Sequence, residues 1–279
     1  AVLTDAIVKH TNFHDANLEG VDISGKDLTG TILTEADLTN ANLAGVDLSG
    51  KDLTGTILKG ADLTDAVLPN ISLSDTNFQK TVFDGLDLSG KDISKSSLWY
   101  ASFKNTNMKN TDLRESDLMM VDLSNIKNKS LAGSDLTDAS FLLANLSGVS
   151  LDGVILAQTN FWKANLSGVD FTVTSKTPYR GSLFNKSNLS NSNFEGVNLS
   201  PQQLFTTPFK NKAYLNNLEG AALFDSIFEM MGYPNIQIIS KEVSGNDLVV
   251  SYLFFNNFND ANLENANFKN AGLAHVSFF

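Results

Sequence analysis

The chain has 279 residues, of which 31 are acidic and 20 are basic, and it contains no cysteine. The missing cysteine excludes disulfides and thiolate metal sites, and a net charge of −11 argues against a basic nucleic-acid-binding face. The longest apolar run, LVVSYLFF at 248–255, is far shorter than the roughly 20 residues of a membrane-spanning helix. The chain starts at Ala1, which fits a processed export signal or a trimmed chain. The compartment stays open, with export favoured over the cytoplasm.

Apolar residues recur every five positions from Leu3 to Leu123, giving 25 repeat centres in one register. A small residue such as Ala36 usually stands two positions before the centre, and Asp or Asn lies between them. A period of five matches neither the 3.6 of a helix nor the 2.0 of a strand. A strict short repeat predicts a solenoid whose core forms only when successive turns stack.

Units such as ADLTN (36–40), ANLAG (41–45) and ANLEN (261–265) resemble those of the pentapeptide-repeat family. The resemblance implies an all-β fold, a right-handed quadrilateral β-helix with four pentapeptides in each coil. It also implies that the centre and the small residue before it point inward, and that the other three residues face solvent. Lys26, Lys51 and Lys91 depart from this pattern because they occupy inward positions. Their stems are expected to reach outward between coils, since a buried ammonium without a partner is costly.

The register breaks in three places, which divides the chain. We expect repeats over 1–204, with loops at 124–130 and 172–183. The stretch 205–250 is predicted to be an insertion. Within it, a capping-box pattern precedes a helical stripe over 216–232, and two apolar runs flank SGND as in a β-hairpin. Repeats return over 251–279 and are expected to complete the solenoid.

Few residues are candidates for catalysis or metal binding. His10 and His14 lie far along the chain from His275, and the Asp residues belong to the repeat and fall on all four faces. Convergent titratable groups, which catalysis requires, are therefore not expected. The sequence predicts a non-enzyme that needs no cofactor and holds no metal.

One column of the solenoid surface is unusual. Trp99 and Tyr100 follow the centre Leu98, and stepping forward by one coil of 20 residues, or 23 across the loop at 124–130, reaches further apolar pairs. The seven residues, called the apolar stripe below, are Trp99, Tyr100, Met119, Met120, Leu142, Leu143 and Trp162. A contiguous apolar strip rimmed by polar residues usually marks a contact surface.

The favoured function is a rigid scaffold that binds another protein, or a second copy of itself, through the apolar stripe. Lys176, Tyr179 and Arg180 in the second loop are additional candidate contacts. A competing interpretation is that the helix expected at 216–232 folds back and covers the stripe.

The resemblance also implies an alternative function, because several pentapeptide-repeat proteins present an acidic rod that imitates B-DNA to type II topoisomerases, some protecting gyrase from inhibitors. Residues 1–125 hold 19 acidic and 10 basic residues, about half the charge density of B-DNA over the same length. This alternative therefore ranks second.

Overall fold

The computed structural model describes most of the solenoid and the strands beside it. The residues described are 3, 6–174, 182, 184, 186–194, 197, 205–209, 236–244, 247–254, 256, 258, 260–271, 273 and 276.

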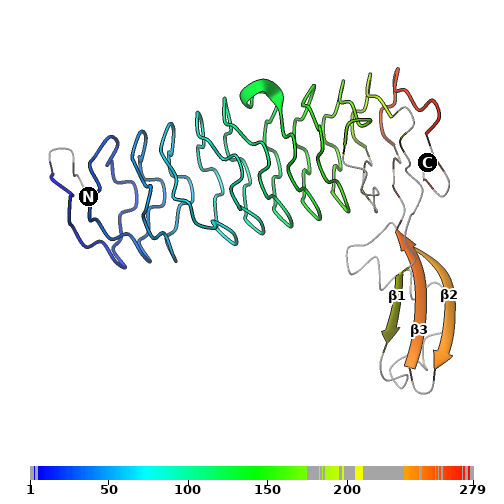
Figure 1. Cartoon of the computed structure of the whole chain (residues 1–279), viewed down its shortest axis with the longest axis horizontal. Coiled ribbons are helices and arrows are strands. Elements are labelled where there is room, and N and C mark those ends of the chain that lie inside the picture. Colours follow the sequence, from blue (N-terminus) through cyan, green and yellow to red (C-terminus); the bar gives the residue numbers. More distant parts are fainter. Residues whose placement is uncertain are drawn as a thin grey trace.

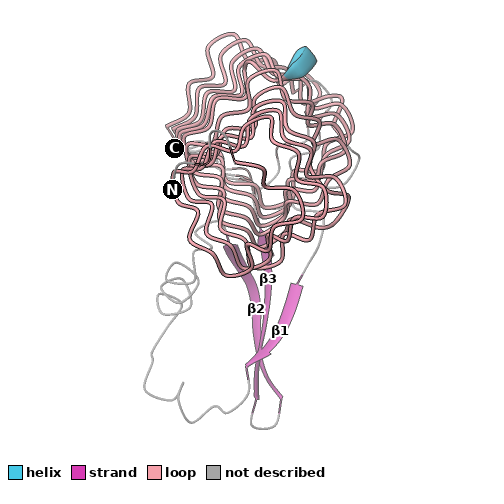
Figure 2. Cartoon of the chain, turned by 90° about the vertical axis from the view of Figure 1, so that its left-hand side faces the viewer, coloured by secondary structure: helices cyan, strands magenta, loops and turns pink. Residues whose placement is uncertain are grey.

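The repeats form a right-handed quadrilateral β-helix, seen from the side in Figure 1 and nearly along its axis in Figure 2. Neighbouring coils are joined by parallel backbone hydrogen bonds. The amide of Leu43 donates to Asp62 O at 2.7 Å, and the amide of Asp62 donates back to Ala41 O at 2.8 Å. Each coil therefore satisfies its backbone groups through the coils on either side.

A tight turn closes each pentapeptide. In a typical corner the amide of Ala41 donates to Leu38 O at 3.0 Å, and Asn40 between them has φ 57°. This is the geometry of a type II turn, whose third residue must adopt positive φ. Gly and Asn are favoured at that position because they tolerate the left-handed region, which explains why they recur at the end of the repeat.

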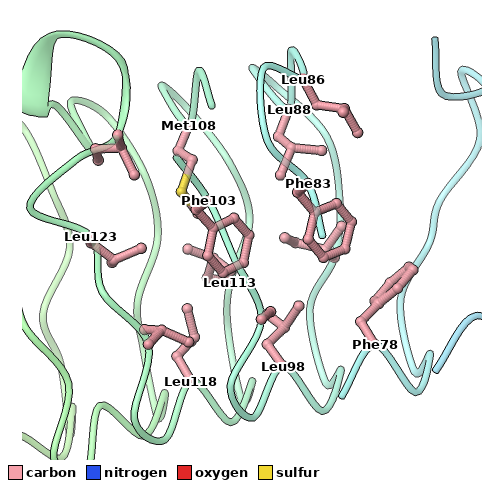
Figure 3. Packing of buried hydrophobic residues seen from close by; sticks show 14 of the residues in the cluster. Phe78, Phe83, Leu86, Leu88, Leu98, Phe103, Met108, Leu113, Leu118 and Leu123 are labelled. Atoms are coloured by element: carbon pink, nitrogen blue, oxygen red, sulfur yellow. The ribbon is translucent and has the colours of Figure 1, made fainter. Parts of the chain in front are cut away.

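The core is a stack of the repeat centres. Leu63, Phe83 and Phe103 are among the fully buried side chains, and the rings of the last two stack at 5.2 Å between centroids. Figure 3 shows how centres from successive coils, including Phe83, Phe103 and Leu123, line up inside the solenoid. Since each centre packs mainly on its equivalents in adjacent coils, the hydrophobic core is continuous along the axis.

The loop expected at 124–130 is a short detour on one corner. It contains the 3₁₀ turn η1 (Lys127–Lys129), while Ile126 beside it is buried. The parallel ladder continues across it, because Asp122 pairs with Asn145, 23 residues later. The three extra residues are therefore accommodated without loss of register, as the sequence predicted.

The three inward lysines find backbone partners in the preceding coil. Lys26 Nζ donates to Ala6 O at 3.3 Å, and Lys51 Nζ donates to Thr31 O at 3.2 Å. Lys91 Nζ donates to Pro69 O at 2.7 Å. All three side chains are only half-buried, so the stems extend between coils and no ammonium is left unpartnered.

The insertion contains a three-stranded antiparallel sheet in the order β1-β3-β2 (Figure 1). Strands β2 (Ile236–Ser244) and β3 (Asp247–Phe254) form the expected hairpin, and β3 ends beyond the predicted boundary at 250. Strand β1 (Phe205–Phe209), which the sequence did not predict, pairs with β3. Its Pro208 is compatible with an edge strand, where an amide donor is not needed. The helix predicted at 216–232 lies outside the described residues, and the domain boundaries stay a prediction.

After the insertion the chain rejoins the solenoid. Asn188 and Asn193 pair with Asn262 and Asn267, 74 residues later. Phe184 stacks on Phe258 with 4.7 Å between ring centroids. The returning repeats thus take the place that the next coil would have occupied.

We predict that Leu63→Asp destabilises the protein by more than about 4 kcal/mol, because it buries a charge without a partner inside the stack. Lys59→Asp places the same carboxylate on an exposed position of the neighbouring repeat and is the control. Thermal unfolding followed by circular dichroism measures both, and equal melting temperatures for the two variants would contradict the inward assignment of Leu63.

Candidate protein-interaction surface

Backbone hydrogen bonds join the apolar stripe from coil to coil. The amide of Tyr100 donates to Met119 O at 3.2 Å, and that of Met120 donates to Leu142 O at 2.9 Å. The next step is the bond from the amide of Leu143 to Trp162 O at 3.0 Å. The seven residues predicted from the spacing therefore lie in four successive coils, on one corner of the solenoid.

The stripe is accessible among the described residues. Tyr100 is 52% exposed, and Trp99, Met120 and Leu143 are 38–39% exposed. Met119, Leu142 and Trp162 are half-buried. Exposed and half-buried side chains are interspersed, so the stripe has an apolar base and protruding apolar groups.

Three stripe residues have an unfavourable backbone conformation. Tyr100, Met120 and Leu143 have φ of 57°, 60° and 60°. Elsewhere in the described part of the chain, positive φ occurs at glycine or at Asn, Asp, Glu, Gln, Lys and His. The left-handed region is unfavourable for a bulky L-residue by about 1–2 kcal/mol. This unfavourable conformation recurs at the same corner in three consecutive coils. The repeat chemistry itself would favour Gly or Asn there.

Polar groups border the stripe. The indole Nε1–H of Trp99 donates to the carboxylate of Asp117, which lies one coil further on. At the other end, the ammonium of Lys163 lies 4.2 Å from the centroid of the Trp162 ring, in a cation–π contact. These contacts orient the two indoles, so the stripe begins and ends with a fixed aromatic ring.

Repeat carboxylates have a structural task that the sequence analysis missed. Asp27 Oδ1 accepts the amide of Thr29 at 2.8 Å and the Thr29 hydroxyl at 2.5 Å. Asp52 accepts from Thr54 in the same way, at 2.9 and 2.6 Å. This is an Asx-type cap of the corner turn. In the sequence, these caps are indicated by the recurring order of Asp, repeat centre, and Ser or Thr.

The caps shift acid–base equilibria. Hydrogen bonds from the hydroxyl and then the amide of Thr29, assisted by Lys9, lower the pKa of Asp27 from 3.8 to about 2. The Thr54 hydroxyl and amide likewise lower the pKa of Asp52. Donors that stabilise the carboxylate favour its ionised form. These carboxylates serve the fold by holding the corner turns.

Two of the remaining candidate residues, His10 and His14, lie in the described part of the chain. His10 and His14 are exposed, and Nδ1 of His14 lies 3.1 Å from Thr34 O. His275 and the loop residues Lys176, Tyr179 and Arg180 lie outside the described residues. Within the described part of the chain, no cluster of three or more His, Cys, Asp or Glu side chains has the arrangement of a metal site. No described helix is long and apolar enough to cross a membrane.

The repeat is matched by the model of a known family. The model for pentapeptide repeats matches residues 1–34, 27–60, 56–90, 92–125 and 144–172, which together make up more than half of the chain. The chain belongs to the pentapeptide-repeat family. No curated protein matches it.

Several solved pentapeptide-repeat structures are similar to this chain. HetL, a protein involved in heterocyst differentiation regulation from the cyanobacterium Nostoc sp. strain PCC 7120, is 23% identical with a TM-score of 0.22, over 96% of this chain and 83% of HetL. The plasmid-mediated fluoroquinolone resistance protein QnrB1 is 21% identical with a TM-score of 0.26, over 63% of this chain and 83% of QnrB1. A thylakoid-lumen protein from Arabidopsis thaliana is 24% identical with a TM-score of 0.22, over 43% of this chain and 70% of that protein. Such weak likenesses carry no functional argument.

In this pentapeptide-repeat chain, we predict that acid destabilises the fold through the carboxylate caps. The pKa of Asp27 is lower in the folded state, so its contribution is present above pH 3.8 and is lost as pH falls through about 2. Melting temperatures measured between these values should fall less steeply for Asp27→Asn than for the natural protein.

Thr29→Val is the companion variant, because it removes the hydroxyl donor but keeps the amide donor. It should also flatten the dependence on pH. A slope that is unchanged in both variants would contradict the role assigned to the cap.

Proposed function

We propose that this protein is a non-enzymatic, rigid interaction scaffold, and that the apolar stripe binds another protein or a second copy of the chain. Trp99, Tyr100 and Trp162 are the anchors, since aromatic side chains dominate binding energy at protein interfaces.

The observation that carries the proposal is the positive φ of Tyr100, Met120 and Leu143. Backbone strain that recurs where a permissive residue would remove it is typical of functional positions. Burial within the solenoid does not account for the three side chains, because each is at least 39% exposed. A contact made outside the solenoid does account for them.

The rigidity of the scaffold supports the same function. Residues on successive coils are held at the inter-strand spacing of about 4.8 Å, so the stripe presents its side chains with little loss of conformational entropy on binding. Preorganisation of this kind raises affinity for a given area.

We predict that the triple variant Tyr100→Asn, Met120→Asn, Leu143→Asn loses partner binding by about 100-fold or more, because it removes the protruding apolar groups. The same variant should keep or raise the melting temperature, since Asn tolerates left-handed φ. Affinity capture from the native source, followed by mass spectrometry and by titration of the recovered partner, measures binding. Sedimentation measures self-association.

The matched control is Lys95→Asn, Glu115→Asn, Asp138→Asn. These residues also have positive φ, of 57–59°, and lie five residues before the stripe positions, one corner away. The control should bind as the natural protein does. Equal binding by both triple variants would refute the proposal. If a type II topoisomerase were the partner that both retained, the acidic-rod alternative would be favoured instead.

A further inference from the structure

The ladder of hydrogen bonds between coils is interrupted in the N-terminal half of the chain. Although all of 51–78 is described, no backbone hydrogen bond joins residues 51–58 to residues 70–78. Equivalent positions in the first coil are paired, because the amides of Phe13 and Asp15 donate to the next coil at 2.9 and 3.1 Å. The solenoid is therefore open on this face.

The opening adjoins a stretch around Pro69 that lacks the usual corner turn. The ladder is kept on either side of this stretch. The amide of Val67 donates to Val46 O at 3.0 Å, and that of Leu73 donates to Asp92 O at 2.8 Å. Between them lies Pro69, which has no amide donor. Ile71, at a position where the repeat points inward, is 43% exposed.

A groove of about 450 Å³ lies along this opening. It is lined mainly by small side chains and by the exposed Ile57 and Ile71. Asp75 is its one charged lining residue. The walls of the groove therefore consist mainly of small side chains, with two exposed isoleucines and one negative charge.

Both walls offer unused main-chain groups. The amides of Leu53 and Gly55 on one wall, and that of Asn77 on the other, donate to no described acceptor. The amides of Phe13 and Asp15, at equivalent positions in the first coil, bond to a parallel strand. An extended chain lying in the groove would complete the ladder on both sides, which is the physical basis of strand addition in peptide recognition.

We propose that the groove between residues 53–57 and 71–77 binds an extended peptide with basic and apolar side chains. Main-chain hydrogen bonds to Leu53, Gly55 and Asn77 hold the peptide, while Ile57 and Ile71 contact its apolar side chains. Charge complementarity selects a basic peptide, because Asp75 is the one charged residue that lines the groove and residues 1–125 carry 19 acidic and 10 basic residues.

Peptide binding is tested on the full-length protein with a short blocked peptide that alternates valine with lysine, labelled for fluorescence anisotropy. We expect Ile57→Asn, Ile71→Asn together to weaken binding about tenfold, because apolar contact area is lost. Asp75→Asn should weaken it several-fold, and more at low salt. A peptide methylated on alternate main-chain nitrogens should not bind, because the methyl groups hold its carbonyl groups away from the amides of the groove.

Matched controls come from outside the groove. Ile32→Asn changes an isoleucine that is 47% exposed but lies outside the groove. Asp15→Asn changes the aspartate of the corresponding corner in the first coil, where φ is 57° as it is 58° at Asp75. Neither should alter binding, and the triple asparagine variant of the apolar stripe should not alter it either.

Amide hydrogen exchange provides a second readout. Without peptide, the amides of Leu53, Gly55 and Asn77 should exchange rapidly, and the peptide should protect them. Slow exchange before addition would show that the coils close on each other and would overturn the proposal. So would equal binding of the methylated peptide, equal binding of an acidic peptide, or affinity unchanged in the groove variants. Concentration-dependent self-association that the groove variants abolish would assign the groove to a second copy and refute the peptide site.

Discussion

Hydrogen bonding between coils is the constraint on which the rest of the molecule depends. Each pentapeptide is too short to form a stable element alone. Beyond the corner turns, its backbone groups pair with residues 20 positions away, 23 across a three-residue detour or 74 across the insertion. This non-local pairing fixes which side chains stack. The buried centres, the corner turns and the Asx caps all follow from keeping that spacing, because a slip by one residue would turn the inward pair toward solvent.

Because hydrogen bonds hold the coils in register, side chains on the surface form regular columns. The position of a residue in the sequence determines the column that its side chain occupies. Most columns carry residues that serve the solenoid, such as Asp27 beneath the corner turn or Asn40 within it. The apolar stripe does not serve it. Tyr100, Met120 and Leu143 adopt a conformation that asparagine would adopt at lower cost, so local stability and surface chemistry disagree at this corner, as they often do at functional positions.

Places where hydrogen bonds between coils are missing differ from loops, which insert residues but keep the pairing. The detour at η1 (Lys127–Lys129) adds residues yet preserves pairing. The interruption near Pro69 adds no residues, but two coils are unpaired there along one face. At the inward lysines, an ammonium takes a carbonyl that a strand amide would otherwise use, as at Thr31 O. An extended peptide could use the unpaired groups near Pro69 because solvent reaches them, whereas a buried break would be costly.

The sequence by itself determined the solenoid, its inward residues and the column in which Trp99 and Trp162 lie. Because the repeat has a period of five and a coil has 20 residues, the column of a residue follows from counting along the chain. It also indicated the hairpin of β2 and β3. Only the tertiary structure decided the left-handed φ at Tyr100, the carbonyl partners of Lys51, the pairing of β1 with β3 and the open face near Ile71. Those features depend on whether a backbone group meets a partner in another coil or strand. Local periodicity does not contain that information, since the partner is set by how distant segments register against one another.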